Sequence, residues 1–266
     1  MSAKRTTKGT ATVPFFWSVL LIIIGILLLL DNFLLLGDFN AYTLVPLLLV
    51  VAGAQILLRG DLFPSEDART FGITRGSVES ATLEISSGEI DVDVRALGRE
   101  GRLIAGQFAA GSRPDLTVKD TYTHIKMSRS NTPWLSFADW HVGLAHDLPW
   151  QLLISSSLGQ LNLDLKMLII HDALIASGIG DIRLVAPKEA FRPLIIRSTM
   201  GNIQINTPQG YRTRIVVEGG RLFGIKHDEY RYENPEPNVY FSTEAAEDAP
   251  LVEIHVSGTF GDVYLV

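Results

Sequence analysis

The sequence predicts an α-helical membrane hairpin followed by an all-β domain of stacked repeats. Two apolar runs occupy residues 13–36 and 42–58, and uncharged runs of about 20 residues are long enough to cross a bilayer as helices. From residue 76 onward apolar and polar residues alternate, which places one set of side chains on each face of a strand. We therefore expect a basic tail at 1–12, the hairpin at 13–59, a linker at 60–75 and the β-repeat domain at 76–266.

Composition excludes several classes of function. The chain has 266 residues, with 23 basic and 29 acidic side chains and no cysteine. A net negative charge supplies no basic surface for phosphate, so nucleic acid is not an expected partner. Without cysteine there is no disulfide framework, thiolate metal site or thiol nucleophile.

The N-terminal runs are predicted to form two antiparallel transmembrane helices. Residues 15–30 and 44–58 carry no charge, and only residues 37–41 clearly separate the two runs. The first run is too long for a signal-peptide core, lacks a small-x-small cleavage site and is followed directly by a second apolar run. The lipid bilayer is therefore the first expected partner of this protein.

The charges that flank the hairpin predict its orientation. Lys4, Arg5 and Lys8 precede the first run and Arg59 follows the second, whereas the intervening loop carries only Asp38. Basic residues close to helix ends are retained in the cytoplasm. We expect a two-helix protein of the plasma membrane with both termini, and the β domain, in the cytoplasm.

Asp31 and Asn32 are polar residues near the end of the first run, and they allow two interpretations. An intramembrane carboxylate points to function by default. At the interface, however, the same pair serves equally well as a helix cap among lipid headgroups. Both interpretations stay open.

An internal repeat organises the β domain. The phrase glycine-polar-apolar-polar-apolar begins at residues 88, 159, 180, 201 and 261, with a degenerate copy at 220, and the glycines at 159, 180 and 201 are 21 residues apart. Two residues after each glycine stands an apolar residue, in chain order Ile90, Leu161, Ile182, Ile203, Leu222 and Val263. Another stands five residues before each glycine, so a strand is expected on either side of a glycine corner.

A unit of about 20 residues with two short strands cannot bury its apolar side alone, but stacked units form a continuous core. The prediction is an all-β stack, either a single-handed solenoid or a toast-rack of two sheets packed face to face. The alternation fits both equally well.

Two segments depart from the repeat. Residues 128–150 contain Trp134, Phe137, Trp140 and Trp150, which are interpreted either as an interaction surface for a partner or the bilayer interface, or as rings that cap the end of the stack. Residues 226–250 are acidic and predict a solvated loop around one strand at 239–241.

Candidate catalytic, cofactor and metal sites are weak, so we predict no site of any of these kinds and no enzyme activity. The densest cluster of metal-ligand types is Asp139, His141, His146 and Asp147. A carbohydrate-cleaving β-helix would need converging carboxylates. Asp91, Asp93, Asp164 and Asp181 are instead interleaved with Arg183, Asn202 and Gln204, as on a solvated sheet face.

The sequence resembles a known bacterial family. The apolar phrases at 25–32 and 46–53 resemble the transmembrane region of LiaF-type envelope proteins, although the chain shows only two helices where the family hairpin can have four. Residues 150–208, with their Ser-Gly-Ile-Gly-Asp phrase at 177–181, resemble the adhesin-like or toast-rack β-repeat module fused to it. The resemblance implies a non-enzymatic membrane protein of the envelope-stress or antibiotic response, often acting beside a sensor kinase.

Three hypotheses about function follow. The first is a membrane-anchored interaction module that regulates a membrane protein such as a sensor kinase. The second is a scaffold that self-assembles through an uncapped end of the stack. The third, less favoured, is a carbohydrate-active β-helix enzyme, which would require the domain to face outward.

Overall fold

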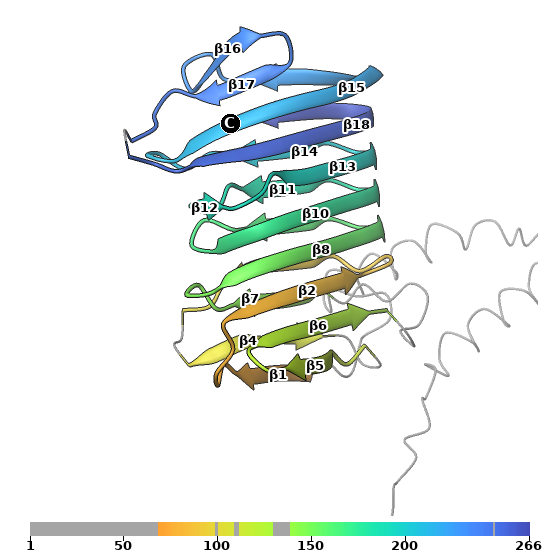
Figure 1. Cartoon of the computed structure of the whole chain (residues 1–266). Coiled ribbons are helices and arrows are strands. Elements are labelled where there is room, and N and C mark those ends of the chain that lie inside the picture. Colours follow the sequence, from red (N-terminus) through yellow and green to blue (C-terminus); the bar gives the residue numbers. More distant parts are fainter. Residues whose placement is uncertain (1–68, 99–100, 109–111, 130–138, 247) are drawn as a thin grey trace, which may run out of the picture. The chain divides into compact units, whose positions relative to one another are not determined.

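The computed structural model describes residues 69–98, 101–108, 112–129, 139–246 and 248–266 (Figure 1). The chain divides between Pro64 and Ser65 into two units, and all described residues belong to the second. The predicted hairpin, with Asp31 and Asn32, lies outside the described residues. Within the described ranges there is no helix of the length and apolarity needed to cross a membrane.

The described residues form two layers of strands that are mostly parallel within each layer (Figure 1). The predicted all-β stack is thereby confirmed. In order along the stack, the first layer contains β5 (Asp115–Lys119), β6 (Tyr122–Ser128), β2 (Ser80–Ser86), β8 (Pro149–Leu158), β10 (Ile169–Ile179), β13 (Leu194–Met200), the first halves of β18 (Leu251–Leu265) and β15 (Arg212–His227), β17 (Val239–Ser242) and β16 (Tyr232–Glu236).

The second layer follows the same order. It contains β1 (Arg69–Thr74), β4 (Arg102–Phe108), β7 (Trp140–Leu144), β3 (Val92–Ala96), β9 (Leu161–Asp164), β11 (Ile182–Val185), β14 (Ile203–Asn206) and the second halves of β18 and β15. A short strand, β12 (Glu189–Ala190), pairs with the start of β10. The rungs β2–β3, β8–β9, β10–β11 and β13–β14 each have one strand in each layer, joined by a corner, and β15 and β18 each pass through both layers.

Alternating burial builds one core between the layers. In β10, Ala173, Ile175 and Ser177 are buried while Leu174 is exposed, as period two requires. The equivalent strands β8 and β13 pair with β10 in parallel, so inward side chains of successive rungs stack on each other. Because every rung adds to the same core, no unit needs to fold alone.

The spatial order of the rungs differs from their order in the sequence. The rung β2–β3 lies between β8–β9 and β6–β7, since β2 pairs with β6 and β8 and β3 pairs with β7 and β9. At the other end, β18 lies between β13–β14 and β15. The fold is therefore not a single solenoid wound in sequence order.

Two of the six predicted repeat copies are out of the predicted register, by two residues in β2–β3 and by up to three residues in β15. Leu83 pairs with Leu152 and Val92 with Leu161, which moves Gly88 out of line with Gly159. In β15, Ile215 pairs with Ile254, which is a shift of two, but a register shift follows between Gly219 and Leu222, and Ile225 pairs with Val263, which is a shift of three. A slip of two residues preserves the alternation of faces, so the apolar pattern does not detect it. The shift of three reverses the faces, and the predicted inward residue Leu222 is 64% exposed.

Antiparallel strands flank the first end of the stack in both layers and the far end in the first layer. β5 is antiparallel to β6, and β4 is antiparallel to both β7 and β1. At the far end, β17 is antiparallel to β15 and to β16. The predicted acidic loop at 226–250 therefore contains two strands, β16 and β17, and not only the one expected at 239–241. The predicted linker at 60–75 is too long, because β1 already begins at Arg69.

Candidate interaction surface

The predicted aromatic surface is wrong for Trp140 and Trp150. Both side chains are fully buried, because the alternation of β7 and β8 turns them into the core. Trp150 Nε1 donates a hydrogen bond to the carbonyl oxygen of Ala145 at 2.8 Å. Both lie in inner rungs, so they do not cap the stack either. Trp134 and Phe137 lie outside the described residues.

The residues of the histidine and aspartate cluster at 139–147 engage separate partners. His141 Nδ1 lies 3.9 Å from Asp93 Oδ1 on the neighbouring strand β3, whereas Asp147 forms an ion pair with Arg75. Over the ranges that the structure describes, no three histidine or acidic side chains gather in a group that could hold a metal ion.

The polar residues that follow the corners bind the backbone of the next rung. The amide of Gln160 donates to Asp91 Oδ1 at 2.6 Å, and the amide of Asn202 donates to Asp181 Oδ1 at 2.8 Å. The ladder continues from the amide of Asp262 to Asn202 Oδ1 at 3.1 Å. These side chains therefore satisfy corner amides that the strand ladders leave open, a role that the alternation alone did not reveal.

A groove crosses the second layer where β1, β3, β4 and β7 meet. It has a volume of about 1040 Å³, and its lining combines charged and apolar side chains, including Phe71, Asp93, Arg95, Leu97, Arg102 and His141. Arg102 extends across β1, since a Cβ placed on Gly72 would lie 2.7 Å from its Nη1. A mixed lining of this kind suits a macromolecular or peptide partner.

Sequence reasoning missed this groove. Its basic residues, Arg95 and Arg102, lie at ordinary polar positions of two strands that are not neighbours in the stack, separated by β7. The one signal of the groove in the sequence is the pair of glycines, Gly106 in β4 and Gly143 in β7. A Cβ at Gly106 would lie 1.9 Å from the carbonyl oxygen of His141, so these strands approach too closely there for any larger residue.

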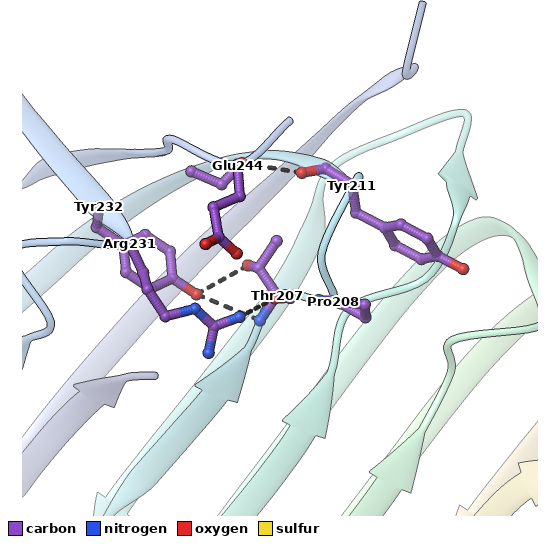
Figure 2. Close-up of a pocket in the computed structure, with 7 residues that line it drawn as sticks. Thr207, Pro208, Tyr211, Arg231, Tyr232 and Glu244 are labelled. Carbon is purple, nitrogen blue, oxygen red and sulfur yellow. Dashed lines mark hydrogen bonds between the residues drawn. The ribbon is translucent and has the colours of Figure 1, made fainter. Parts of the chain in front are cut away.

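A second hollow, near the β16–β17 hairpin, is a small polar pocket of about 10 Å³ (Figure 2). The Tyr232 hydroxyl donates to Thr207 Oγ1 at 2.9 Å, and Arg231 Nη2 donates to the Thr207 carbonyl oxygen at 2.6 Å. Figure 2 shows both side chains directed at Thr207, while the Tyr211 ring points away. Burial raises the pKa of Tyr232.

This pocket is a structural joint between the hairpin and the stack. Its volume is about what one water molecule needs, which leaves no room for an organic ligand. The hydrogen bonds join Arg231 and Tyr232, at the start of the hairpin, to Thr207 at the end of β14. The groove is therefore the larger candidate surface.

Comparison with known proteins identifies the domain. A family model described as the N-terminal domain of toast_rack, DUF2154, matches residues 65–206. No curated protein matches the chain. One solved structure, a candidate cell adhesion protein from Clostridium sporogenes ATCC 15579, is 14% identical with a TM-score of 0.62 over 75% of this chain and 98% of its own.

A second solved structure, a candidate adhesin from Bacteroides fragilis NCTC 9343, is 10% identical over 76% of this chain and 99% of its own. Its TM-score of 0.32 is too low to carry a structural argument. The first structure shows that the two-layer fold occurs in another chain. Since the family model covers more than half of the residues, this protein belongs to the toast_rack family and carries its N-terminal domain.

Proposed function

We propose that this protein is a non-enzymatic, membrane-anchored interaction module of the bacterial cell envelope that acts by protein–protein contacts in the envelope-stress or antibiotic response. The observation that carries the proposal is a toast_rack domain built as a rigid two-layer stack with an open, charged groove on one layer. Such a stack offers a fixed surface to a partner, as repeat folds generally do.

The expected partner is a membrane protein such as a sensor kinase. The apolar runs at 13–36 and 42–58 would hold the domain at the inner face of the plasma membrane, which limits the search for partners to that surface. The fold shared with a candidate cell adhesion protein also fits a role in binding. A carbohydrate-active enzyme is less well supported, because Asp91 and Asp181 bind corner amides of neighbouring rungs.

The scaffold alternative is weakened by the ends of the stack. Open parallel edges invite pairing with another copy, but in the first layer both ends carry antiparallel strands, β5 at one end and the β16–β17 hairpin at the other. Sedimentation of the full chain in detergent tests this alternative, since growth of filaments with protein concentration would favour it.

A detergent pull-down with matched variants tests the proposal. The full chain with Arg95→Glu and Arg102→Glu reverses two charges in the groove, whereas Arg183→Glu reverses one exposed charge on the same layer outside the groove. We expect the groove variant to lose a membrane-protein partner that the wild type and the Arg183→Glu control retain. If all three chains retain the partner equally, the groove is not the binding surface. If none of them retains a membrane-protein partner, the protein is not an interaction module.

A reporter fused after Val266 tests the orientation. We expect it to be active only on the cytoplasmic side, since the termini are predicted to lie there. Activity only outside the cell would overturn the proposed location and revive the enzyme alternative.

A further inference from the structure

Five large apolar side chains form an exposed ladder along one edge of the stack. This is the corner edge, at which the glycine corners join the two layers. The five side chains are Leu158, Ile179, Met200, Phe260 and Leu222, with exposed fractions of 50%, 49%, 47%, 41% and 64%. In the parallel register Ile179 lies between Leu158 and Met200, and Phe260 lies between Met200 and Leu222. The ladder is therefore continuous through five neighbouring rungs.

The ladder is a feature of the corner and not of the strand faces. Leu158, Ile179, Met200 and Phe260 each directly precede a corner glycine, where the chain turns from one layer to the other. Neighbouring strands are about 4.8 Å apart, so the ladder extends for about 19 Å. Exposed apolar residues scattered singly are ordinary, but a contiguous row marks a surface that is covered by something.

The acidic residues beside the ladder are engaged by neighbouring rungs. Asp181 accepts a hydrogen bond from the amide of Asn202, and Asp262 forms an ion pair with Lys226 at 2.8 Å. At the opposite edge, where the strands are joined by turns, Met167, Phe191 and Leu251 are exposed, but they are not paired with one another in the strand registers. The corner edge is thus the edge that carries a continuous apolar row.

The chain enters the domain at the same corner edge. β7 starts there, because Trp140 pairs with Val92, the first residue of β3 after the corner. β4 runs against β7 and β1 runs against β4, with Arg69 paired to Phe108. Arg69 therefore lies at the corner edge, and the ten residues from 59 to 68 reach at most about 35 Å from the end of the second apolar run.

We infer that the corner edge rests on the lipid bilayer, with the ladder side chains among the interfacial lipids. This inference depends on the membrane anchoring in the proposed function. A lipid surface fits a row that is one side chain wide, since a stable contact with a second copy needs about 1,200 Å² or more of buried surface. The bilayer would also be within reach of the edge at which the chain enters.

The absence of cysteine from the chain allows a direct test with single-cysteine variants. Met200→Cys places an environment-sensitive fluorophore on the ladder, and Met167→Cys places it at an exposed position of the opposite edge. Both full-length variants are reconstituted into vesicles of phosphatidylcholine and phosphatidylglycerol, with and without spin-labelled lipid. Retention of the wild-type circular dichroism and thermal midpoint verifies that each variant is folded.

We expect a blue-shifted emission and several-fold stronger quenching by spin-labelled lipid at position 200 than at position 167. Quenching at position 200 that is as weak as at position 167 would overturn the inference. A blue shift without lipid quenching, or a disulfide between two Met200→Cys chains, would also overturn it, because protein would then cover the ladder.

Flotation of the same vesicles separates this inference from the proposed function. A chain that floats with the vesicles but shows no lipid quenching at position 200 keeps its anchor and lacks the edge contact. A chain that does not float has no anchor, so both the anchoring and the edge contact fail together.

Discussion

Gly180 lies directly against Gly159 of the neighbouring rung, so that a Cβ on Gly180 would be 2.0 Å from the Gly159 carbonyl oxygen. Gly201 contacts Gly180 in the same way, at 2.3 Å. Gly180 also has a φ of 138°, a conformation that favours glycine. The corner therefore needs glycine both for its backbone angle and for the close approach of the rungs.

Gly180→Ala should destabilise the domain strongly. The added methyl group meets backbone atoms that cannot rotate away, and the strained φ adds to this, so we expect a loss of about 3 kcal/mol in the free energy of unfolding. Urea unfolding of residues 65–266, which contain a hydrophobic core of their own, measures it. Gly220→Ala is the control, because its nearest neighbour, the Thr259 carbonyl oxygen, is 3.8 Å away. A small effect at both positions would contradict the stacked corners.

Trp150→Phe should cost more stability than Trp140→Phe. Both rings are fully buried, but only Trp150 has a described partner for its indole N–H, the Ala145 carbonyl oxygen. Among the described residues, Trp140 Nε1 has no hydrogen-bond partner. Each change leaves a cavity, and we expect Trp150→Phe to lose about 1 kcal/mol more in urea unfolding. Equal losses would mean that the indole hydrogen bond does not stabilise the fold.

Tyr232→Phe should loosen the joint between the β16–β17 hairpin and the stack. It removes the hydroxyl that bonds to Thr207 Oγ1, and we expect a loss of about 1–2 kcal/mol in the free energy of unfolding. Tyr230→Phe is the matched control, since Tyr230 is 92% exposed. An equal effect of the two changes would show that the buried hydroxyl is unimportant.

The raised pKa of Tyr232 predicts that the fold loses stability in alkali. Burial raises the pKa of Tyr232 above its ordinary value of 10.0, so the unfolded chain releases this proton first as the pH rises. The stability associated with neutral Tyr232 is complete below pH 10 and falls from there upward. Unfolding curves of Tyr232→Phe should depend less on pH in that range than those of the wild type.

Glu253 should contribute stability that is lost in acid. The hydrogen bond with His255, and then the charge of Arg214, lower the pKa of Glu253 below its ordinary value of 4.5. The contribution is therefore present above pH 4.5 and disappears as the pH falls through the lowered pKa. Since the group is partly exposed, we expect Glu253→Gln to remove about 0.5 kcal/mol at neutral pH and little in acid, as measured by urea unfolding.

Glu218→Gln is the control for this prediction, since it neutralises an exposed glutamate on β15, the strand that also carries Arg214. Its effect on stability should change little between neutral and acidic pH. A Glu253→Gln effect that is the same at both pH values would exclude a role for the ionised carboxylate.

The amino-acid sequence by itself determined the all-β class, the repeat and the two strands of each rung. Alternating residues such as Leu161 and Leu163 can bury one face only as strands, and the glycines at 159, 180 and 201 set the corners. Those features depend on neighbours within one unit, which a local pattern records. The same pattern does not separate a core ring from a surface ring, so it predicts Trp140 and Trp150 either as an interaction surface or as end caps, and not as core residues of inner rungs.

Only the tertiary structure decided the order of the rungs, their register, and the surfaces that result. Val92 pairs with Leu161, where the repeat predicts Ile90, yet a shift by two residues buries the same face and changes no local preference. The insertion of β2–β3 and β18 inside the stack depends on contacts between distant segments. The groove at Arg95 and Arg102 and the apolar ladder through Met200 exist only because those distant segments become neighbours.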